Sequence, residues 1–216
     1  AEVFPGSSLP NAMVQVSPVT KFHSGAGYQY EDSVIYGFTH TNKGHWNLCH
    51  IPLLPVTGTP TPGDYCSPFS HERESAAPGY YQVFLDRYGV DAQLSSTLRC
   101  AFHKYTYPAG AAASLLADLQ RSNEHVRAWD IRKEGDNVFA GWQQTGEKMY
   151  FYAVANRPVT GIEPVVEGDR EVRIVRFGEG DGALELRIGF SFVSEKNARE
   201  NLEAEMLGKS FAEVRS

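Results

Sequence analysis

The chain has 216 residues, of which 42% are hydrophobic and 21% are charged, and its formal net charge is −6. This composition excludes a disordered tail and a fibrous protein, and the length fits one large domain or two small ones. The acidic balance disfavours a nucleic-acid-binding protein with a basic face. No apolar run approaches the ~20 residues that a membrane-spanning helix needs.

The first 47 residues or so are rich in glycine, serine, histidine and aromatic residues and are weakly periodic. Residues 13–16 and 34–38 are expected to be strands, and residues 48–54 form a short apolar run. Residues 55–68 contain four prolines, which predicts a long surface loop.

The middle of the chain alternates apolar and polar residues at a spacing typical of antiparallel strands. Residues 79–107 contain three linked segments of this kind, which predict a meander. Residues 111–119 are ambiguous between helix and strand. Further strands are expected at about 8–12-residue spacing, which favours a sandwich or a barrel. They cover residues 126–132, 138–145 and 149–155, and residues 171–177 and 183–192 as a hairpin around the glycine-rich turn 178–182.

The C-terminal segment has a helical pattern instead. Ser194 is a plausible N-cap, apolar residues then recur every four positions through Met206, and Gly208 is a natural stop. Ser210 and Glu213 match a capping box, which opens a second helix. A natural domain rarely ends one turn into a helix, so we expect the chain to be a fragment of a longer protein.

Histidines and cysteines are the first candidates for chemistry. His40, His45 and His50 recur every five residues, and a zinc or iron site is one interpretation. A spacing of five sends successive side chains to opposite faces of a strand, and neither HExxH nor a close HxH pair is present, so packing or ligand hydrogen bonding is favoured. Cys49 and Cys100 each lie near a histidine, but buried cysteines are usually inert.

The remaining motifs are mostly uninformative. The third cysteine, Cys66, makes the count odd, which leaves room for one disulfide but does not predict a framework. No GxSxG elbow and no Walker or Rossmann glycine loop is present, and no two acidic residues stand out as a glycosidase pair.

Trp46 is the aromatic residue with the strongest indication of ligand contact. It lies among Lys43, His45 and Asn47, and such polar neighbours favour a loop over the core. Sugars bind through apolar faces on aromatic rings and through hydroxyls on amide, imidazole or charged groups. Trp129 and Trp142 lie in alternating segments, and we expect both to be core residues.

Four segments together resemble the N-terminal part of glycoside hydrolase family 92, the calcium-dependent exo-α-mannosidases. They are VFPGSSLPNAMVQVSP at residues 3–18, GYQYEDSVIYGFTHT at 27–41, FSHERESAAPGYYQVFLDRYGVDAQLSSTLRCAFHKYTYP at 69–108 and GFSFVSEKNARENLEAEM at 189–206. They occur in the expected order over most of the chain.

The resemblance implies an all-β fold, a large antiparallel β-sandwich of the galactose-mutarotase-like or supersandwich type with a C-terminal helix. Residues 1–193 would be the sandwich, and residues 194–216 would be a helical linker to a C-terminal (α/α)6 barrel. The family inverts stereochemistry with one acid and one base. These carboxylates and most of the calcium ligands come from the barrel, so the resemblance implies neither catalytic residues nor metal ligands in this chain.

The resemblance also implies a substrate-binding wall. The loop 44–49 (GHWNLC) is similar to that of members acting on α-1,2-linked mannose, as in high-mannose N-glycans. Trp46 would stack on the leaving sugar, with Gly44, His45 and Asn47 around it. The segment 22–25, with Ser24 and Gly25, would line the terminal-mannose subsite. A secreted, periplasmic or outer-surface bacterial location follows from the same resemblance, and we expect this chain alone to be inactive.

Two alternatives are open at this stage. The first is a stand-alone carbohydrate-binding β-sandwich module, which shares the aromatic contact but needs no second domain. The second is a metal enzyme built on the three spaced histidines.

Overall fold

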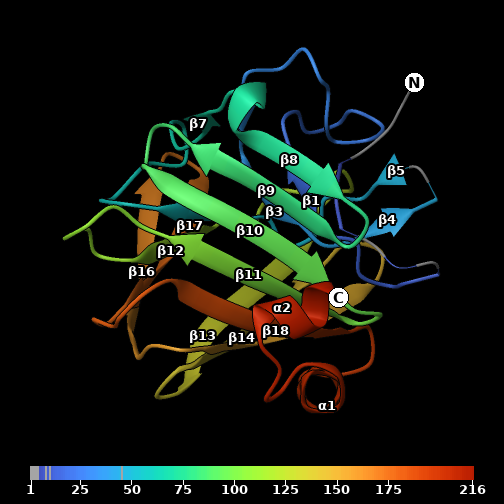
Figure 1. Cartoon of the computed structure of the whole chain (residues 1–216). Helices are drawn as coiled ribbons and strands as arrows, with labels where there is room; N and C mark the ends of the chain where they lie inside the picture. The colour runs from blue at the N-terminus through green and yellow to red at the C-terminus, as the bar shows by residue number, and fades with distance from the viewer. Residues whose placement is uncertain (1–4, 8, 10, 45) are drawn as a thin grey trace.

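Two antiparallel β-sheets face each other in the computed structural model, which describes residues 5–7, 9, 11–44 and 46–216 (Figure 1). The six-stranded sheet has the order β1-β3-β6-β12-β17-β16, formed by Ser17–Val19, Gly37–Thr39, Leu53–Val56, Ser114–Ala117, Arg170–Phe177 and Val159–Glu167. The eight-stranded sheet has the order β13-β14-β15-β18-β11-β10-β9-β8, formed by Ala128–Gly135, Val138–Gln144, Lys148–Ala155, Leu184–Ser191, Cys100–Thr106, Val90–Ser96, Tyr80–Leu85 and Glu74–Ala77.

Short elements lie outside these two sheets. β2 (Val34–Ile35) pairs with β7 (Ser67–Pro68), and β4 (Asn42–Lys43) pairs with β5 (Trp46–Asn47). A 3-10 helix covers His71–Arg73. The β4–β5 hairpin projects beside the sandwich at the right of the view (Figure 1).

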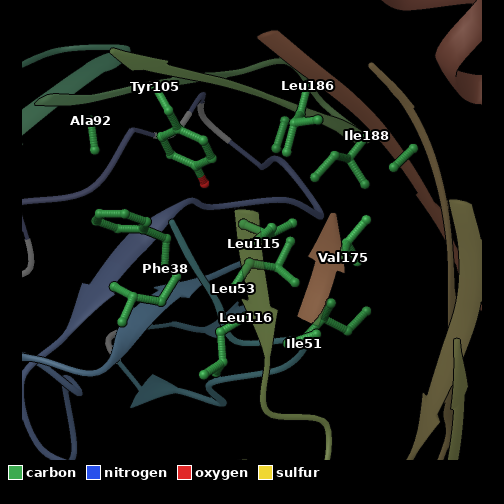
Figure 2. Packing of buried hydrophobic residues seen from close by; sticks show 14 of the residues in the cluster. Phe38, Ile51, Leu53, Ala92, Tyr105, Leu115, Leu116, Val175, Leu186 and Ile188 are labelled. Carbon is green, nitrogen blue, oxygen red and sulfur yellow. The ribbon is translucent and has the colours of Figure 1, made fainter. Parts of the chain in front are cut away.

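The core lies between the two sheets. Strand β15 alternates between half-buried and buried residues along its whole length, as expected when one face of a strand covers a core. In Figure 2, Phe38 and Leu115 of the six-stranded sheet face Tyr105 and Leu186 of the eight-stranded sheet, and all four are fully buried. Burying a side chain of this size contributes ~1.5–3 kcal/mol, so this shared core determines how the sheets pack.

The meander predicted over residues 79–107 is confirmed as β9, β10 and β11, and the ambiguous segment 111–119 contains strand β12. The predicted hairpin between residues 171–177 and 183–192 is wrong. β17 pairs with β16 and β12 in one sheet, while β18 pairs with β11 and β15 in the other. Residues 178–182 therefore cross between the sheets.

Other differences come from short or exposed strands. β16 was missed because it is largely exposed and contains Pro164, as an edge strand allows. The strand expected at residues 13–16 contributes only a bridge at Val16, and the one expected at 34–38 is interrupted at Tyr36. The predicted loop 55–68 begins with the end of β6 and ends with β7.

The C-terminal helices follow the sequence prediction. α1 (Glu195–Glu205) is capped by Ser194, whose hydroxyl accepts the Asn197 N–H, and α2 (Phe211–Arg215) begins with the predicted capping box. Both helices lie on the outer face of the eight-stranded sheet, where a second cluster buries Phe102, Leu202 and Phe211 (Figure 1). Among the described residues, no helix is long and apolar enough to cross a membrane.

Helix α1 touches the backbone of β18 at Gly189. A Cβ atom built at Gly189 would lie 2.1 Å from Ala198 O and 2.9 Å from Leu202 Cβ. No flexible side chain stands between helix and strand to absorb such an atom, so only glycine permits this approach.

We expect Gly189→Ala to destabilise the protein by about 1–3 kcal/mol, because the helix must move away from the sheet. The midpoint of thermal unfolding should fall by about 2–10 °C. Gly146→Ala is the matched control, since a Cβ there has no neighbour within 4 Å. Equal melting temperatures for the two variants would contradict the close approach.

Candidate functional site

The β4–β5 hairpin presents Trp46 at the surface. Lys43 and Trp46 are opposite each other across the hairpin, and Gly44 adopts a φ of +63°, which suits the tight turn between them. The Trp46 side chain is 57% exposed. His45 lies outside the described residues, so its predicted sugar contact stays a prediction.

The segment around Ser24 and Gly25 lies directly against this hairpin. The Asn47 N–H donates to Gly25 O at 2.8 Å. The Asn123 amide nitrogen donates to Ser24 O at 3.1 Å and to Asn47 O at 2.7 Å. The structure thus brings the predicted residues Ser24, Gly25, Trp46 and Asn47 into one surface region.

The buried side chain of Asn47 forms hydrogen bonds beneath this region. It is only 1% exposed, and its Oδ1 accepts the Cys49 N–H at 2.8 Å and the Thr39 hydroxyl at 3.3 Å. Gly27 packs so closely that a Cβ there would lie 2.9 Å from Asn47 Nδ2. A direct contact of Asn47 with sugar stays a prediction, whereas its structural role is evident from these bonds.

Sheet register explains why the loops meet. Phe38 of β3 pairs with Leu53 of β6, and Leu53 pairs with Ala117 of β12. At one end of the strands of the six-stranded sheet, β3 therefore ends, β6 begins and β12 ends. The hairpin after β3 and the segment after β12, which contains Asn123, leave the sandwich side by side.

A cleft next to the segment 22–25 was not predicted from the sequence. Its volume is about 520 Å³, and Arg121, Phe22 and Tyr36 are among the residues that line it. The Arg121 guanidinium carbon lies 4.9 Å from the centre of the Phe22 ring and 5.5 Å from that of Tyr36. Aromatic rings beside a cation are chemistry suited to sugar faces and hydroxyls.

Two of the three spaced histidines have separate partners. His40 is fully buried, and its Nε2 lies 3.0 Å from Nε2 of His103, whose Nδ1 bonds the Tyr105 hydroxyl. Burial lowers the pKa of His40 to about 4 and that of His103 well below 6.5. Both rings are therefore neutral at pH 7, and one Nε2 donates to the other.

His50 bonds the Glu124 carboxylate through Nε2 at 2.6 Å and the Thr41 hydroxyl through Nδ1 at 2.8 Å. Burial lowers the pKa of His50, and Glu124 opposes that effect. Within the described part of the chain, no group of three histidine, cysteine or acidic residues could hold a metal ion. His40 and His50 thus serve internal hydrogen bonds rather than a shared ligand.

The cysteines are unpaired thiols. Burial raises the pKa of Cys49 to about 12 and also raises the pKa of Cys100. Because the thiolate is the nucleophile, neither side chain is suited to attack a substrate at neutral pH.

Two carboxylates, the half-buried Glu74 and the buried Asp118, accept hydrogen bonds within the fold. Glu74 accepts the Tyr28 hydroxyl at 2.9 Å and the Tyr81 hydroxyl at 2.6 Å. Asp118 accepts the Arg170 guanidinium at 2.7 Å. Glu74 and Asp118 therefore take part in hydrogen bonds and an ion pair within the fold.

Trp142 differs from its predicted core position. It is half-buried, and the Lys148 ammonium lies 3.8 Å from the centre of an indole ring. Its neighbour Gln143 is buried instead, so strand alternation places Trp142 on the outer face of the eight-stranded sheet. Trp129 is half-buried and packs against the core.

Comparison with known proteins assigns the family. The model of the glycosyl hydrolase family 92 N-terminal domain matches residues 1–199, and this chain belongs to that family. No curated protein matches.

Solved structures agree with this assignment. A family GH92 α-mannosidase from Bacteroides thetaiotaomicron is 26% identical with a TM-score of 0.90, and the match covers 100% of this chain and 34% of that one. Its complex with mannoimidazole matches with a TM-score of 0.89 at 26% identity, over 99% of this chain and 33% of that one. A GH92 inverting mannosidase from B. thetaiotaomicron VPI-5482 shares the fold, with 20% identity, a TM-score of 0.84 and coverage of 100% and 32%. This chain thus spans about a third of the length of these proteins.

We expect the neutral pair His40–His103 to make stability depend on pH. The unfolded chain takes up protons on these histidines near pH 6.5, whereas the folded chain resists them until about pH 4 or lower. The free energy of unfolding should therefore be highest above pH 6.5 and fall as the pH drops toward 4.

Urea unfolding at several pH values measures this effect. His103→Gln should show a shallower fall, while a variant of the exposed His125, His125→Gln, should behave as wild type. His71 instead stabilises the folded chain as the pH falls, because its hydrogen bond to Glu74 raises its pKa. An equal change in the free energy of unfolding between pH 7 and pH 5 in wild type and in His103→Gln would refute the neutral pair.

Proposed function

We propose that this chain is the N-terminal domain of an exo-acting, inverting α-mannosidase and that it supplies one wall of the sugar pocket. The observation that carries the proposal is the exposed indole of Trp46, held on a hairpin that is bonded to the Ser24–Gly25 segment. Membership of glycosyl hydrolase family 92 supports it. The related structure bound to mannoimidazole supports a mannose-like ligand.

In this proposal the chain binds and orients the sugar. Trp46 packs on the apolar face of the leaving sugar, and the Ser24–Gly25 segment borders the terminal mannose. Substrates are α-mannosides such as the α-1,2-linked mannose of high-mannose N-glycans, and the protein acts in the periplasm, on the outer surface or outside a bacterial cell.

The proton transfers belong to the remainder of the longer protein. Inverting hydrolysis needs a carboxylic acid and a carboxylate about 6.5–9.5 Å apart, one to protonate the leaving oxygen and one to activate water. The carboxylates of Glu74 and Asp118 accept hydrogen bonds from tyrosine and arginine partners within the fold. We assign the acid and the base to a C-terminal barrel.

Calcium is assigned to the same barrel. The described residues of this chain place no three histidine, cysteine or acidic side chains where they could hold a metal ion. Calcium prefers six to eight oxygen ligands, and the described residues do not gather the acidic side chains that such a site uses. No step of the proposed binding by this chain involves the metal.

We expect Trp46→Ala in the longer protein to weaken binding of a mannobiose analogue by on the order of 1–3 kcal/mol, because the stacking surface is lost. Titration calorimetry measures the change. Trp142→Ala is the matched control, since this tryptophan lies on the outer face of the eight-stranded sheet. Unchanged affinity in Trp46→Ala would refute the stacking role.

We expect the 216-residue chain alone to release no mannose from α-1,2-mannobiose, with calcium or with a chelator. The longer gene product should release mannose with inversion, and the chelator should abolish this activity. Mannose is quantified by chromatography and its anomer by NMR. Calcium-dependent release by the short chain would contradict the assignment of the acid, the base and calcium to the C-terminal barrel. Tight mannoside binding by the short chain, with no release by the longer one, would favour a carbohydrate-binding module.

A further inference from the structure

Three residues around the candidate site have backbone conformations that side chains disfavour. His23, Cys49 and Ile51 have φ angles of 60°, 54° and 53°, in the left-handed region. Such conformations are unfavourable for residues other than glycine, and they persist only when surrounding contacts enforce them.

A side-chain amide accepts the N–H of each of these residues. Asn123 Oδ1 lies 2.6 Å from His23 N, and Asn47 Oδ1 lies 2.8 Å from Cys49 N. Gln143 Oε1 lies 2.8 Å from Ile51 N, 92 positions away in sequence. The same chemical group therefore stabilises three disfavoured turns in one region.

Asn123 does more than stabilise one turn. Its amide nitrogen donates to Ser24 O and to Asn47 O, and its backbone N–H donates to Leu48 O at 2.9 Å. One residue thereby joins the segment 22–25 to the β4–β5 hairpin. These partners lie 75 to 100 residues from Asn123 in sequence.

We propose that Asn123 is the positioning residue of the sugar-binding wall: it holds the hairpin of Trp46 and the segment of Ser24 and Gly25 in one fixed arrangement. This inference rests on the proposed mannosidase function and names a residue that does not itself touch the sugar. A wall built before the sugar arrives avoids the entropic cost of ordering two loops on binding.

Asn123→Asp separates the two halves of the amide. The carboxylate still accepts the His23 N–H, but it cannot donate to the two carbonyl oxygens and instead repels them. Asn156→Asp is the matched control. Asn156 also bridges two backbone groups, donating to Ala183 O at 3.0 Å and accepting the Glu185 N–H at 2.9 Å, and these partners lie outside both segments of the wall.

The first measurement is amide hydrogen exchange of the 216-residue chain, which needs no sugar. In Asn123→Asp, exchange in residues 20–27 and 42–49 should become at least about tenfold faster than in wild type, and Asn156→Asp should leave both segments unchanged. Unchanged exchange in Asn123→Asp would overturn the positioning role. If this variant does not fold, Asn123→Ala, which adds no charge, takes its place.

The second measurement is kinetics of the longer protein on α-1,2-mannobiose. Asn123→Asp should raise KM about tenfold or more, with a smaller effect on kcat, because misplaced binding groups weaken recognition. In a Trp46→Ala background the same change should raise KM by a smaller factor than in wild type, because part of its effect acts through the Trp46 hairpin. Equal losses in both backgrounds, or a wild-type KM, would overturn the inference.

The two measurements distinguish the inference from the function on which it rests. Faster exchange in Asn123→Asp, together with a longer wild-type protein that releases no mannose, would refute the mannosidase function and support the positioning of the hairpin. If the longer protein is an active mannosidase, and if Asn123→Asp changes neither the amide exchange nor KM, only the inference is refuted.

Discussion

Apolar side chains of the two sheets share one core, and this burial determines where each loop of the site leaves the sandwich. Phe38, Leu53 and Leu115 are fully buried from the six-stranded side. Their burial requires the register in which β3, β6 and β12 align, since a slip by one residue would turn these side chains outward. The hairpin with Trp46 and the segment with Asn123 consequently leave the six-stranded sheet at the same end of its strands.

Side-chain amides then stabilise the loops that the apolar core brings together. The loops between strands adopt turns that glycine would adopt easily but that His23, Cys49 and Ile51 adopt at a cost. Side-chain amides offset this cost: Asn123 and Gln143 each accept an N–H and donate to carbonyl oxygens, and Asn47 accepts the Cys49 N–H. In the proposed function, loops held by these bonds present the Trp46 indole in a defined place.

Buried titratable groups near the site support structure more than chemistry. The His40 and His103 rings share one hydrogen bond and stay neutral because water cannot reach them. The Cys49 thiol stays protonated for the same reason. In the proposed function these groups therefore support a binding surface rather than catalysis.

Local sequence patterns by themselves located several strands, both helix starts and one exposed side chain. Alternation located β9, β10 and β11, hydrogen-bonding residues at Ser194 and Ser210 marked both helix starts, and the polar neighbours of Trp46 indicated an exposed indole. Only the tertiary structure decided that β17 and β18 lie in different sheets, that Asn47 is buried, and that Asn123 joins the two loops. The reason is physical: alternation and capping depend on residues within a few positions, whereas sheet partners and amide bonds depend on groups up to 100 residues apart that meet only when the core forms.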